Sequence, residues 1–431
     1  MSSTIATDPL SKPQTPRRRS AQIMKNLRAA VIHNHPIHYK HLLFQAMKEQ
    51  QMDFVVLFQA SQSSIRHEKL PLSQDLYRYR IAYDGPYETA PVLLRARWTW
   101  QALQQLSPDF LLISGYHAVE CWSAWFWGAL HRVPRLMWYE SNEFDYKRYW
   151  FREIFKRLFL KGCRGAHVYG RSNKAYLAKL GMPAENITIK RAVVDIEKFD
   201  TPREDKSYRA GDQTRIIYVG RLAPEKNVPV LLRAFAGAVS ALTASSRDAT
   251  RSETAQNAPG QIQPWRTGMR LIIAGTGPDE AALKRQAIAL GIAELVEFKG
   301  YIPQKDLGAL YRQADFFILP STREPWGLVA LEAMLCRIPV IISTQCGCAA
   351  DVVTTNTGWT FSPWNEKELQ EILERLDSVS PAQLRGMGDA AHELASLYSA
   401  DECASLVAQS LRGALGASPD PNGLSGAAYA G

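Results

Sequence analysis

The chain has 431 residues, of which 46% are hydrophobic and 22% are charged, and its formal net charge is +9. This balance excludes collagen-like, coiled-coil and wholly disordered proteins, and the length suggests two or three domains whose cores need no disulfides or metals. The charge is uneven, because residues 1–200 hold 29 basic and 17 acidic side chains, a net charge of +12. Two domains with different partners are therefore indicated, and a polyphosphate, an anionic membrane and nucleic acid all stay open at this point.

Composition divides the chain into two domains and three segments without a core. Residues 1–26, 244–267 and 416–431 are rich in small and polar residues and poor in large apolar ones, so we expect disorder there. Elsewhere, short apolar runs alternate with helical patterns, which is typical of parallel sheets covered by helices. Breaks near 200–213 separate a first domain, 27–200, from a second domain, 213–396.

Short apolar runs place the predicted strands in chain order. In the first domain they are Arg28–His33, Phe54–Phe58, Phe110–Ser114, Leu136–Glu140 and Ala166–Tyr169, with a helix over Tyr39–Glu49. In the second domain they are Arg215–Val219, Arg270–Ala274, Val296–Lys299, Asp315–Leu319 and Val340–Ile342, with helices at about 227–243, 279–290, 304–313, 327–336 and 365–377. Ligands of open parallel sheets bind beyond the carboxyl ends of the strands, so the loops that follow them are examined for a site.

Targeting signals and cysteine spacing indicate the compartment. The first 26 residues contain Arg17-Arg18-Arg19 but no apolar run of a signal peptide, and the longest apolar stretch, 122–130, is too short to span a bilayer. The six cysteines form neither a small disulfide scaffold nor a zinc-binding pattern. We expect a cytoplasmic protein with reduced thiols, and peripheral contact with the inner face of the membrane is left open.

A basic amphipathic segment, 147–161, has two interpretations. It spaces large apolar residues at i, i+4, namely Trp150, Ile154 and Leu158 and also Phe151, Phe155 and Phe159. Such a basic helix can lie on an anionic membrane surface. It can equally pack its apolar stripe on the sheet, and we favour this interpretation because α/β folds require such helices.

The loop after the first strand of the second domain carries two cations. Gly220 permits a close turn, and Arg221 and Lys226 lie between that strand and the next helix. Arg by its fork geometry and Lys as a point charge can together hold a diphosphate. Alone this pattern is weak, because an ordinary solvated loop would look the same.

Two further loops of the second domain have features of a nucleotide site. Gly275 and Gly277 follow a strand, although a tight turn explains them equally well. Gly327 opens a helix whose first N–H groups can bind phosphate. Glu324 precedes this helix, and Glu332 lies inside it among apolar residues, where a carboxylate is costly unless ribose hydroxyls or a basic side chain bond to it.

Together the three loops resemble those of the group 1 retaining glycosyltransferases, which use nucleotide sugars. The resemblance is dense from 214 to 376 and thinner from 28 to 200. It implies an α/β protein of the GT-B type, in which two Rossmann-like domains with parallel sheets face each other across a cleft. It also implies that a last helix, 401–414, crosses back to the first domain.

The resemblance assigns roles to residues of the second domain. The family's Glu-x7-Glu motif falls on Glu324 and Glu332, which it assigns to the donor sugar and the ribose, and its phosphate-binding cations fall on Arg221 and Lys226. The other implied contacts are backbone N–H groups of Leu328 and Val329 at the diphosphate, and Gly275, Tyr301 and Ile302 near the base.

The first domain departs from the family pattern after its first strand. Relatives often have a Gly-rich loop there, whereas this chain has the histidines His33, His35 and His38, with His41 three residues further on. A metal site on them has little weight, because no carboxylates accompany them. His33 and His35 are candidates for the acceptor side.

Two more residues of the first domain end or follow predicted strands. His117 is our candidate for a side chain near the donor sugar, although a loop histidine without a role explains it nearly as well. Glu140 is a candidate for contact with the acceptor.

The sequence thus predicts transfer of a sugar from a nucleoside diphosphate sugar to an acceptor hydroxyl, with retention at the anomeric carbon. The chain has no Asp-x-Asp, so we expect no metal and no other cofactor. The expected acceptor is a glycan or lipid-linked glycan of bacterial-type polysaccharide, glycolipid or glycoconjugate synthesis, and nucleic acid is not an expected partner. Alternatives are a sugar-nucleotide epimerase of the same fold and a non-catalytic interaction protein. The excess positive charge is assigned to the acceptor side.

Overall fold

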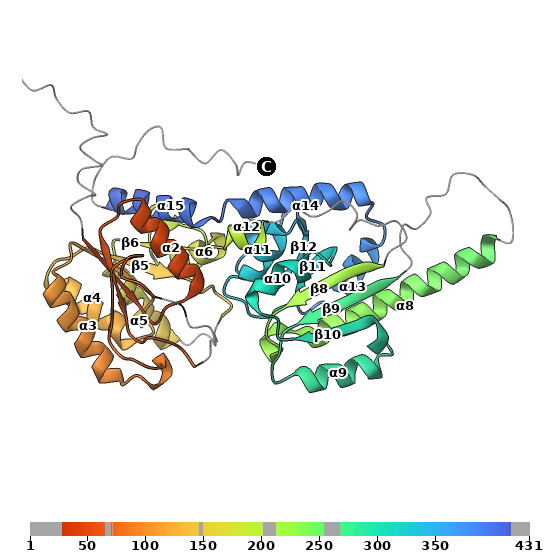
Figure 1. Ribbon diagram of the computed structural model, residues 1–431, viewed down its shortest axis with the longest axis horizontal. Coiled ribbons are helices and arrows are strands. Elements are labelled where there is room, and N and C mark those ends of the chain that lie inside the picture. The colour runs from red at the N-terminus through yellow and green to blue at the C-terminus, as the bar shows by residue number, and fades with distance from the viewer. Residues whose placement is uncertain are drawn as a thin grey trace, which may run out of the picture.

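The computed structural model describes residues 28–64, 70, 72–145, 150–200, 213–253 and 268–414. Two α/β domains follow one another, each built on a parallel sheet (Figure 1). The predicted disordered segments 1–26 and 416–431 lie outside the described residues, as does 254–267.

The first sheet contains seven described strands, all parallel, in the order β3-β2-β1-β4-β5-β6-β7. The strands are β1 (Ala29–His33), β2 (Phe54–Phe58), β3 (Tyr79–Ile81), β4 (Phe110–Ile113), β5 (Arg135–Tyr139), β6 (Gly165–Val168) and β7 (Ile187–Ile189). The helices are α2 (His38–Glu49), α3 (Val92–Leu106), α4 (Val119–Leu130), α5 (Trp150–Lys161), α6 (Arg171–Lys179) and α7 (Ile196–Phe199). Every residue of β1, β2 and β4 is buried, which explains why their sequences are continuous apolar runs.

The two faces of the first sheet carry separate cores. Ala30 and Ile32 of β1 pack toward α3, α4 and α5, whereas Ala29 and Val31 pack toward α2. The same second face is covered by α15 (Ala400–Ala414), whose Val407 belongs to that core. The last helix of the described chain therefore lies on the first domain.

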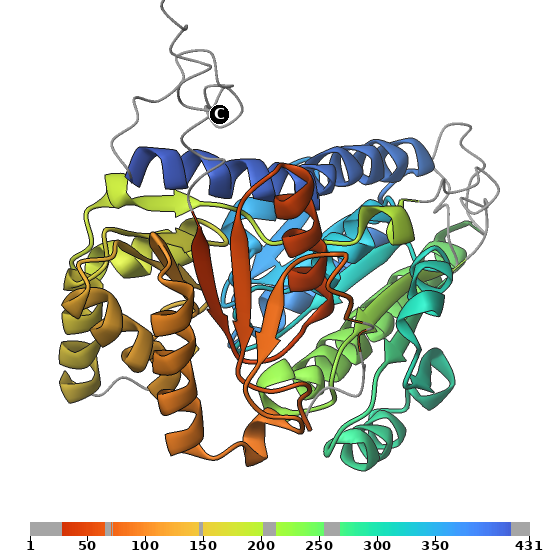
Figure 2. The same ribbon diagram turned by 60° about the vertical axis from the view of Figure 1, so that its left-hand side comes forward.

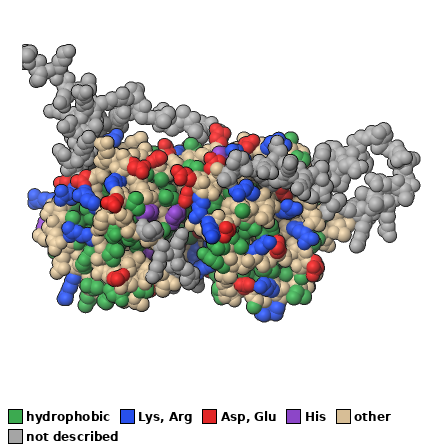
Figure 3. Space-filling model, viewed as in Figure 1, with side chains coloured by type: hydrophobic (Ala, Val, Ile, Leu, Met, Phe, Trp, Pro, Cys, Tyr) green, Lys and Arg blue, Asp and Glu red, His purple; other side chains and the backbone are tan. Residues whose placement is uncertain are grey.

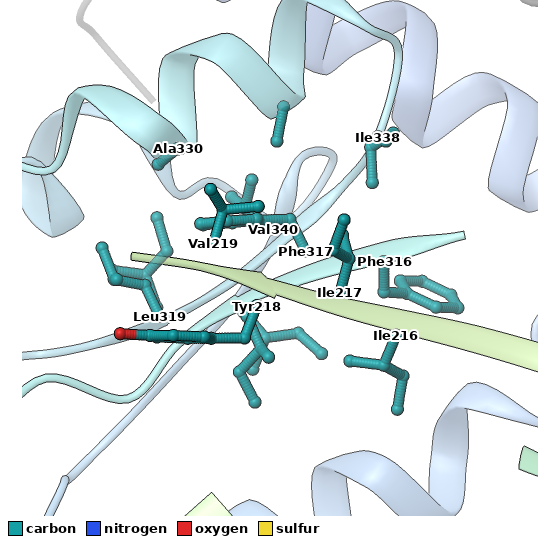
Figure 4. Packing of buried hydrophobic residues seen from close by; sticks show 14 of the residues in the cluster. Ile216, Ile217, Tyr218, Val219, Phe316, Phe317, Leu319, Ala330, Ile338 and Val340 are labelled. Atoms are coloured by element: carbon teal, nitrogen blue, oxygen red, sulfur yellow. The ribbon is translucent and has the colours of Figure 1, made fainter. Parts of the chain in front are cut away.

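The second sheet contains six described strands, all parallel, in the order β10-β9-β8-β11-β12-β13. They are β8 (Thr214–Val219), β9 (Met269–Ala274), β10 (Val296–Gly300), β11 (Phe316–Leu319), β12 (Val340–Ser343) and β13 (Gly358–Phe361). The helices are α8 (Val228–Glu253), α9 (Glu280–Ala289), α10 (Gln304–Tyr311), α11 (Leu328–Leu335), α12 (Ala349–Val352), α13 (Glu366–Leu376) and α14 (Pro381–Ser396). Figure 4 shows Ile216 and Tyr218 on one side of β8 and Ile217 and Val219 on the other, so this central strand is buried on both faces.

Three short strands and one helix end differ from the sequence prediction. β3, β7 and β13 were not predicted, because none of them is buried along its whole length and none forms a continuous apolar run. Helix α8 continues to Glu253, so residues 244–253, for which composition predicts disorder, are helical. Their Ala and Arg content supports a helix.

The end of the chain joins the domains. Helix α14 packs on α11 of the second domain, and α15 then lies along α2 of the first (Figure 2, the two blue helices). Across the junction, the backbone N–H of Arg171 donates to both carboxylate oxygens of Asp351, at 3.1 and 3.0 Å. Hydrogen bonds and helix packing therefore hold the two domains together near the carboxyl ends of their strands.

Candidate functional site

A cavity of about 660 Å³ lies between the two domains. Its first-domain wall comes from the loops after β1, β2, β5, β6 and β7, and its second-domain wall from the loops after β8, β10 and β11. In Figure 3, histidine side chains gather on the first-domain side of the junction. The site therefore occupies the place where open parallel sheets bind ligands.

The loops after β8, β9 and β11 form one continuous structure. The N–H of Leu222 donates to the carbonyl of Thr276 at 2.9 Å, and the N–H of Thr322 donates to the carbonyl of Glu225 at 2.9 Å. Gly275 has φ +139°, and a Cβ there would overlap the carbonyl of Gly220. This glycine therefore allows two loops to touch.

Two cations of the loop after β8 lie at the cavity. Lys226 Nζ donates to Glu324 Oε2 at 2.5 Å, and both side chains are largely buried. Arg221 pairs with Glu225, but 63% of its side-chain surface is exposed. The hydroxyl of Tyr218 donates to the carbonyl of Arg221 at 2.8 Å and holds this turn in place.

The start of α11 faces the same cavity. Gly327 has φ +104°, a conformation that L side chains rarely adopt. The segment before it is held by the N–H of Gly347, which donates to the carbonyl of Glu324 at 2.9 Å, and Leu328 and Val329 then line the cavity. The first N–H groups of a helix have no partner within the helix, so this end is suited to an anion.

Glu332, one turn further along α11, has an unusual environment. Burial raises the pKa of its carboxyl group to about 7, although the hydroxyl of Tyr311 donates to its Oε2 at 3.1 Å and opposes the rise. It lines the cavity from the same side as Glu324. A cavity-facing carboxyl group with this pKa is suited to hydrogen bonding with neutral hydroxyl groups.

The first-domain wall holds a buried charge cluster around Trp138. Lys40 and Lys190 are 1% and 0% exposed, and their Nζ atoms lie 4.1 and 4.6 Å from the centre of the Trp138 ring. Lys40 pairs with Glu140, which lines the cavity. Burial opposes ionisation of Glu140, but Lys40 and Lys190 outweigh it and lower its pKa to about 2.

The histidines after β1 have separate partners. His33 contacts the His35 carbonyl and His35 contacts the Pro36 carbonyl, each at 3.0 Å. His38 contacts Asp195 at 2.9 Å, and His41 contacts the Tyr77 hydroxyl at 3.0 Å. No group of three possible metal ligands occurs among the described residues. The His side chains are therefore used in structural contacts rather than gathered around one point.

The cavity brings most of the predicted site residues together. Those that line it are Arg221, Lys226, Tyr301, Glu324, Leu328, Val329, Glu332, His35 and Glu140. Of the described residues that were predicted for the site, four do not line it, namely His33, His117, Gly275 and Ile302. His33 is buried between Phe44 and Phe58, and burial lowers the pKa of both His33 and His117.

Sequence reasoning missed two residues that line the cavity, His38 and Trp326, and one that contacts its wall, Asn142. His38 Nε2 lies 2.9 Å from Asp195 Oδ2 and Asn142 Nδ2 donates to the Glu324 carbonyl at 3.2 Å, in each case between segments far apart in sequence. Trp326 is 3% exposed, and its Nε1 has no hydrogen-bond partner within the described part of the chain. The only feature of the sequence that pointed to Trp326 was its position between Glu324 and Gly327.

Comparison with known proteins agrees with this geometry. Residues 200–385 match the family model for glycosyl transferases group 1. An uncharacterized glycosyltransferase of Methanocaldococcus jannaschii is 31% identical over 165 residues, which are 38% of this chain and 36% of that protein. Matches to the first curated relatives span 36% to 51% of their length.

Solved structures share the fold over nearly the whole chain. Sucrose-phosphate synthase from Thermosynechococcus elongatus superposes with a TM-score of 0.67 at 18% identity, covering 91% of this chain and 100% of that one. Anabaena HepE in complex with UDP gives 0.66 at 17% identity, covering 90% and 100%. The chain therefore has the two-domain GT-B fold. Its second domain matches the model for glycosyl transferases group 1 over most of its length, within residues 200–385.

Proposed function

We propose that the protein transfers a sugar from a nucleoside diphosphate sugar to an acceptor hydroxyl, with retention at the anomeric carbon and without a metal. The observation that carries the proposal is the convergence of Arg221, Lys226, Glu324, Glu332 and the start of α11 on one wall of the interdomain cavity. A sugar diphosphate needs cations at its phosphates and carboxyl groups at its hydroxyls, and this wall offers both.

Charge stabilisation at the leaving group is the main catalytic effect in this proposal. When the bond between the anomeric carbon and the phosphate oxygen breaks, negative charge grows on the diphosphate. Lys226, Arg221 and the first residues of α11 line this position, so their positive charge and free N–H groups stabilise the charge that grows in the transition state. Lys226 exchanges its contact with Glu324 for the phosphate, which frees Glu324 for the sugar.

Retention follows from attack on the face that the diphosphate leaves. The acceptor oxygen bonds to the anomeric carbon as the phosphate bond breaks, and the acceptor proton passes to the departing phosphate oxygen. This scheme requires neither a protein nucleophile nor a metal bridge. Its acceptor enters along the first-domain wall, where Glu140 and His35 lie.

Names of similar proteins support the donor class. Anabaena HepE has been solved with UDP and with UDP-glucose, and several relatives of this chain are D-inositol 3-phosphate glycosyltransferases. We infer a nucleotide-sugar donor and an acceptor glycan or lipid-linked glycan, as in polysaccharide or glycolipid synthesis.

A donor panel tests the proposal. UDP- and GDP-sugars are first ranked by the increase in melting temperature that they cause, since a ligand that binds the folded state raises it. The best donor is then incubated with candidate glycan acceptors, and proton NMR determines the anomeric configuration of the product. A product with the donor's configuration is expected. An inverted product contradicts retention, and an epimerised sugar with free nucleotide and no transfer supports the epimerase instead.

A further inference from the structure

Helix α5 turns its apolar residues outward. Trp150, Ile154, Phe155 and Leu158 are 77%, 55%, 59% and 50% exposed, although they belong to the apolar stripe that the sequence interpretation packs on the sheet. That interpretation is wrong for these four residues. The reason is that an amphipathic pattern defines two faces of a helix without stating which one points inward.

The inward face of α5 carries an ion pair beside its buried residues Phe159 and Leu160. Lys156 Nζ contacts Glu153 Oε1 at 2.7 Å and the hydroxyl of Tyr176 at 2.6 Å, and it lies 5.5 Å from the centre of the Tyr116 ring. These contacts fix the rotation of the helix, so the apolar side chains are held toward solvent. Solvent-exposed apolar groups in such a cluster mark an interaction surface.

Helix α4 extends this surface. Its Phe126 and Leu130 are 55% and 69% exposed. The ring of Phe126 lies 5.1 Å from that of Trp125, and Trp125 Nε1 donates to the carbonyl of Phe159 on α5 at 2.9 Å. We call the six exposed residues the α4–α5 face: Phe126, Leu130, Trp150, Ile154, Phe155 and Leu158.

The exposed charged residues of α4 and α5 are all basic. Arg152, Arg157 and Lys161 of α5 are exposed. The acidic residues of the two helices, Glu120 and Glu153, are turned inward, where Glu120 pairs with Arg95 and Glu153 with Lys156. Aromatic and aliphatic groups flanked by cations match the interface of an anionic bilayer. A symmetric dimer through this face would instead bring like charges together.

We propose that the α4–α5 face docks on the surface of an anionic lipid bilayer. Asn142 contacts the Glu324 carbonyl, and Asp145, three residues later, is five positions from Trp150, a separation of at most about 18 Å. A bilayer bound at this face therefore lies beside the interdomain cavity. This placement suits a lipid-linked acceptor, a consequence that rests on the proposed function, whereas the docking itself does not.

Vesicle flotation tests the docking. The full chain is mixed with phosphatidylcholine vesicles with or without phosphatidylglycerol. The double variant Phe155→Ser/Leu158→Ser and the single variant Arg157→Glu are compared with Ile288→Ser, which changes a residue 68% exposed on α9 of the second domain. We expect the chain to float with anionic vesicles only and to be released by salt. The double variant should bind at least about 10-fold more weakly, because two large apolar side chains are lost, and Ile288→Ser should bind normally.

Each other outcome overturns the docking. These outcomes are no flotation of the unaltered chain, binding to neutral vesicles as strong as to anionic ones, and binding by Arg157→Glu as strong as by the unaltered chain. Arg157→Glu carries the test if the double variant does not fold. A doubled mass in light scattering that Phe155→Ser/Leu158→Ser abolishes, without flotation, would assign the face to a second copy. Transfer to a soluble acceptor is assayed in parallel, so that loss of the proposed function is recognised separately.

Discussion

The two domains use their cations in opposite ways. In the first, Lys40 and Lys190 are buried beneath the cavity wall and share the counter-charge of Glu140. In the second, Arg221 and Lys226 reach the cavity itself, and Arg221 is largely exposed. Under the proposed function, the anion site follows from the few cations that reach the cavity and not from the net charge of a domain.

This contrast changes the interpretation of the charge excess. The sequence assigned the +12 of residues 1–200 to the acceptor side of the cleft. One of these charges is buried around Trp138, where Lys40 and Lys190 share the single carboxylate of Glu140. Three more, Arg152, Arg157 and Lys161, lie on the exposed side of α5. The positive half of the chain thus directs much of its charge away from the cavity.

The largest effect is expected in the first domain, on stability. Glu140→Gln leaves the ammonium groups of Lys40 and Lys190 buried without a counter-charge. Since the Glu140 side chain is 35% exposed toward the cavity, we expect the free energy of unfolding to fall by about 3 kcal/mol, the lower end for a broken buried pair. Urea unfolding at neutral pH measures the change.

The matched control is Glu143→Gln, which breaks the surface pair with Lys179 and should cost less than about 0.5 kcal/mol. The folded-state pKa of Glu140 lies below its ordinary value, so its stabilisation is present above about pH 4.5 and is lost as the pH falls toward 2. The gap between Glu140→Gln and the unaltered chain should close over that window. Equal losses in both variants would remove the distinction between buried and surface cations.

The corresponding variant of the second domain, Glu324→Gln, should affect sugar transfer more than stability. Glu324→Gln keeps a neutral acceptor for Lys226 but loses the carboxylate at the donor sugar. We expect the transfer rate to fall about 100-fold, by analogy with the removal of one fixed polar group from a site. The loss of stability should be smaller than that of Glu140→Gln, because Lys226 is 16% exposed whereas Lys40 is 2% exposed. Glu280→Gln, on the outer helix α9, is the control in the same assay. A stability loss as large as that of Glu140→Gln would make Glu324 structural.

A smaller effect concerns Glu332 and pH. Burial raises its folded-state pKa to about 7, so folding favours the protonated form and the stability without ligand falls as pH rises from about 4.5 to 7. Glu332→Gln removes this penalty and keeps an acceptor for Tyr311. At pH 8 its free energy of unfolding should exceed that of the unaltered chain by on the order of 1 kcal/mol. The difference should vanish near pH 4.5. Parallel pH profiles for the two proteins would show that the carboxyl group is not enclosed.

The sequence predicted most central strands because parallel strands buried on both faces have a strong local signal. Phe54–Phe58 was predicted with its observed bounds, and the three second-domain loops follow such strands. The edge strands β3, β7 and β13 have weaker burial and were missed, whereas the edge strand β10 was predicted over Val296–Lys299.

Other features have no local signal at all. Lys40, Trp138 and Lys190 come from α2, β5 and the end of β7, so their cluster depends on sheet order. The rotation of α5 depends on Lys156 finding Tyr176, which the helical pattern alone does not contain.

The central claim is that the second domain, and not the more basic first one, holds the diphosphate. Calorimetric titration with UDP tests it most directly, using the unaltered chain, Lys226→Met, the exposed second-domain control Lys284→Met and the first-domain variant Arg157→Gln. We expect Lys226→Met to bind UDP at least about 10-fold more weakly, a change of 1.4 kcal/mol, while the other two bind normally. Unchanged affinity in Lys226→Met, or a loss in Arg157→Gln of the same size, would contradict the claim.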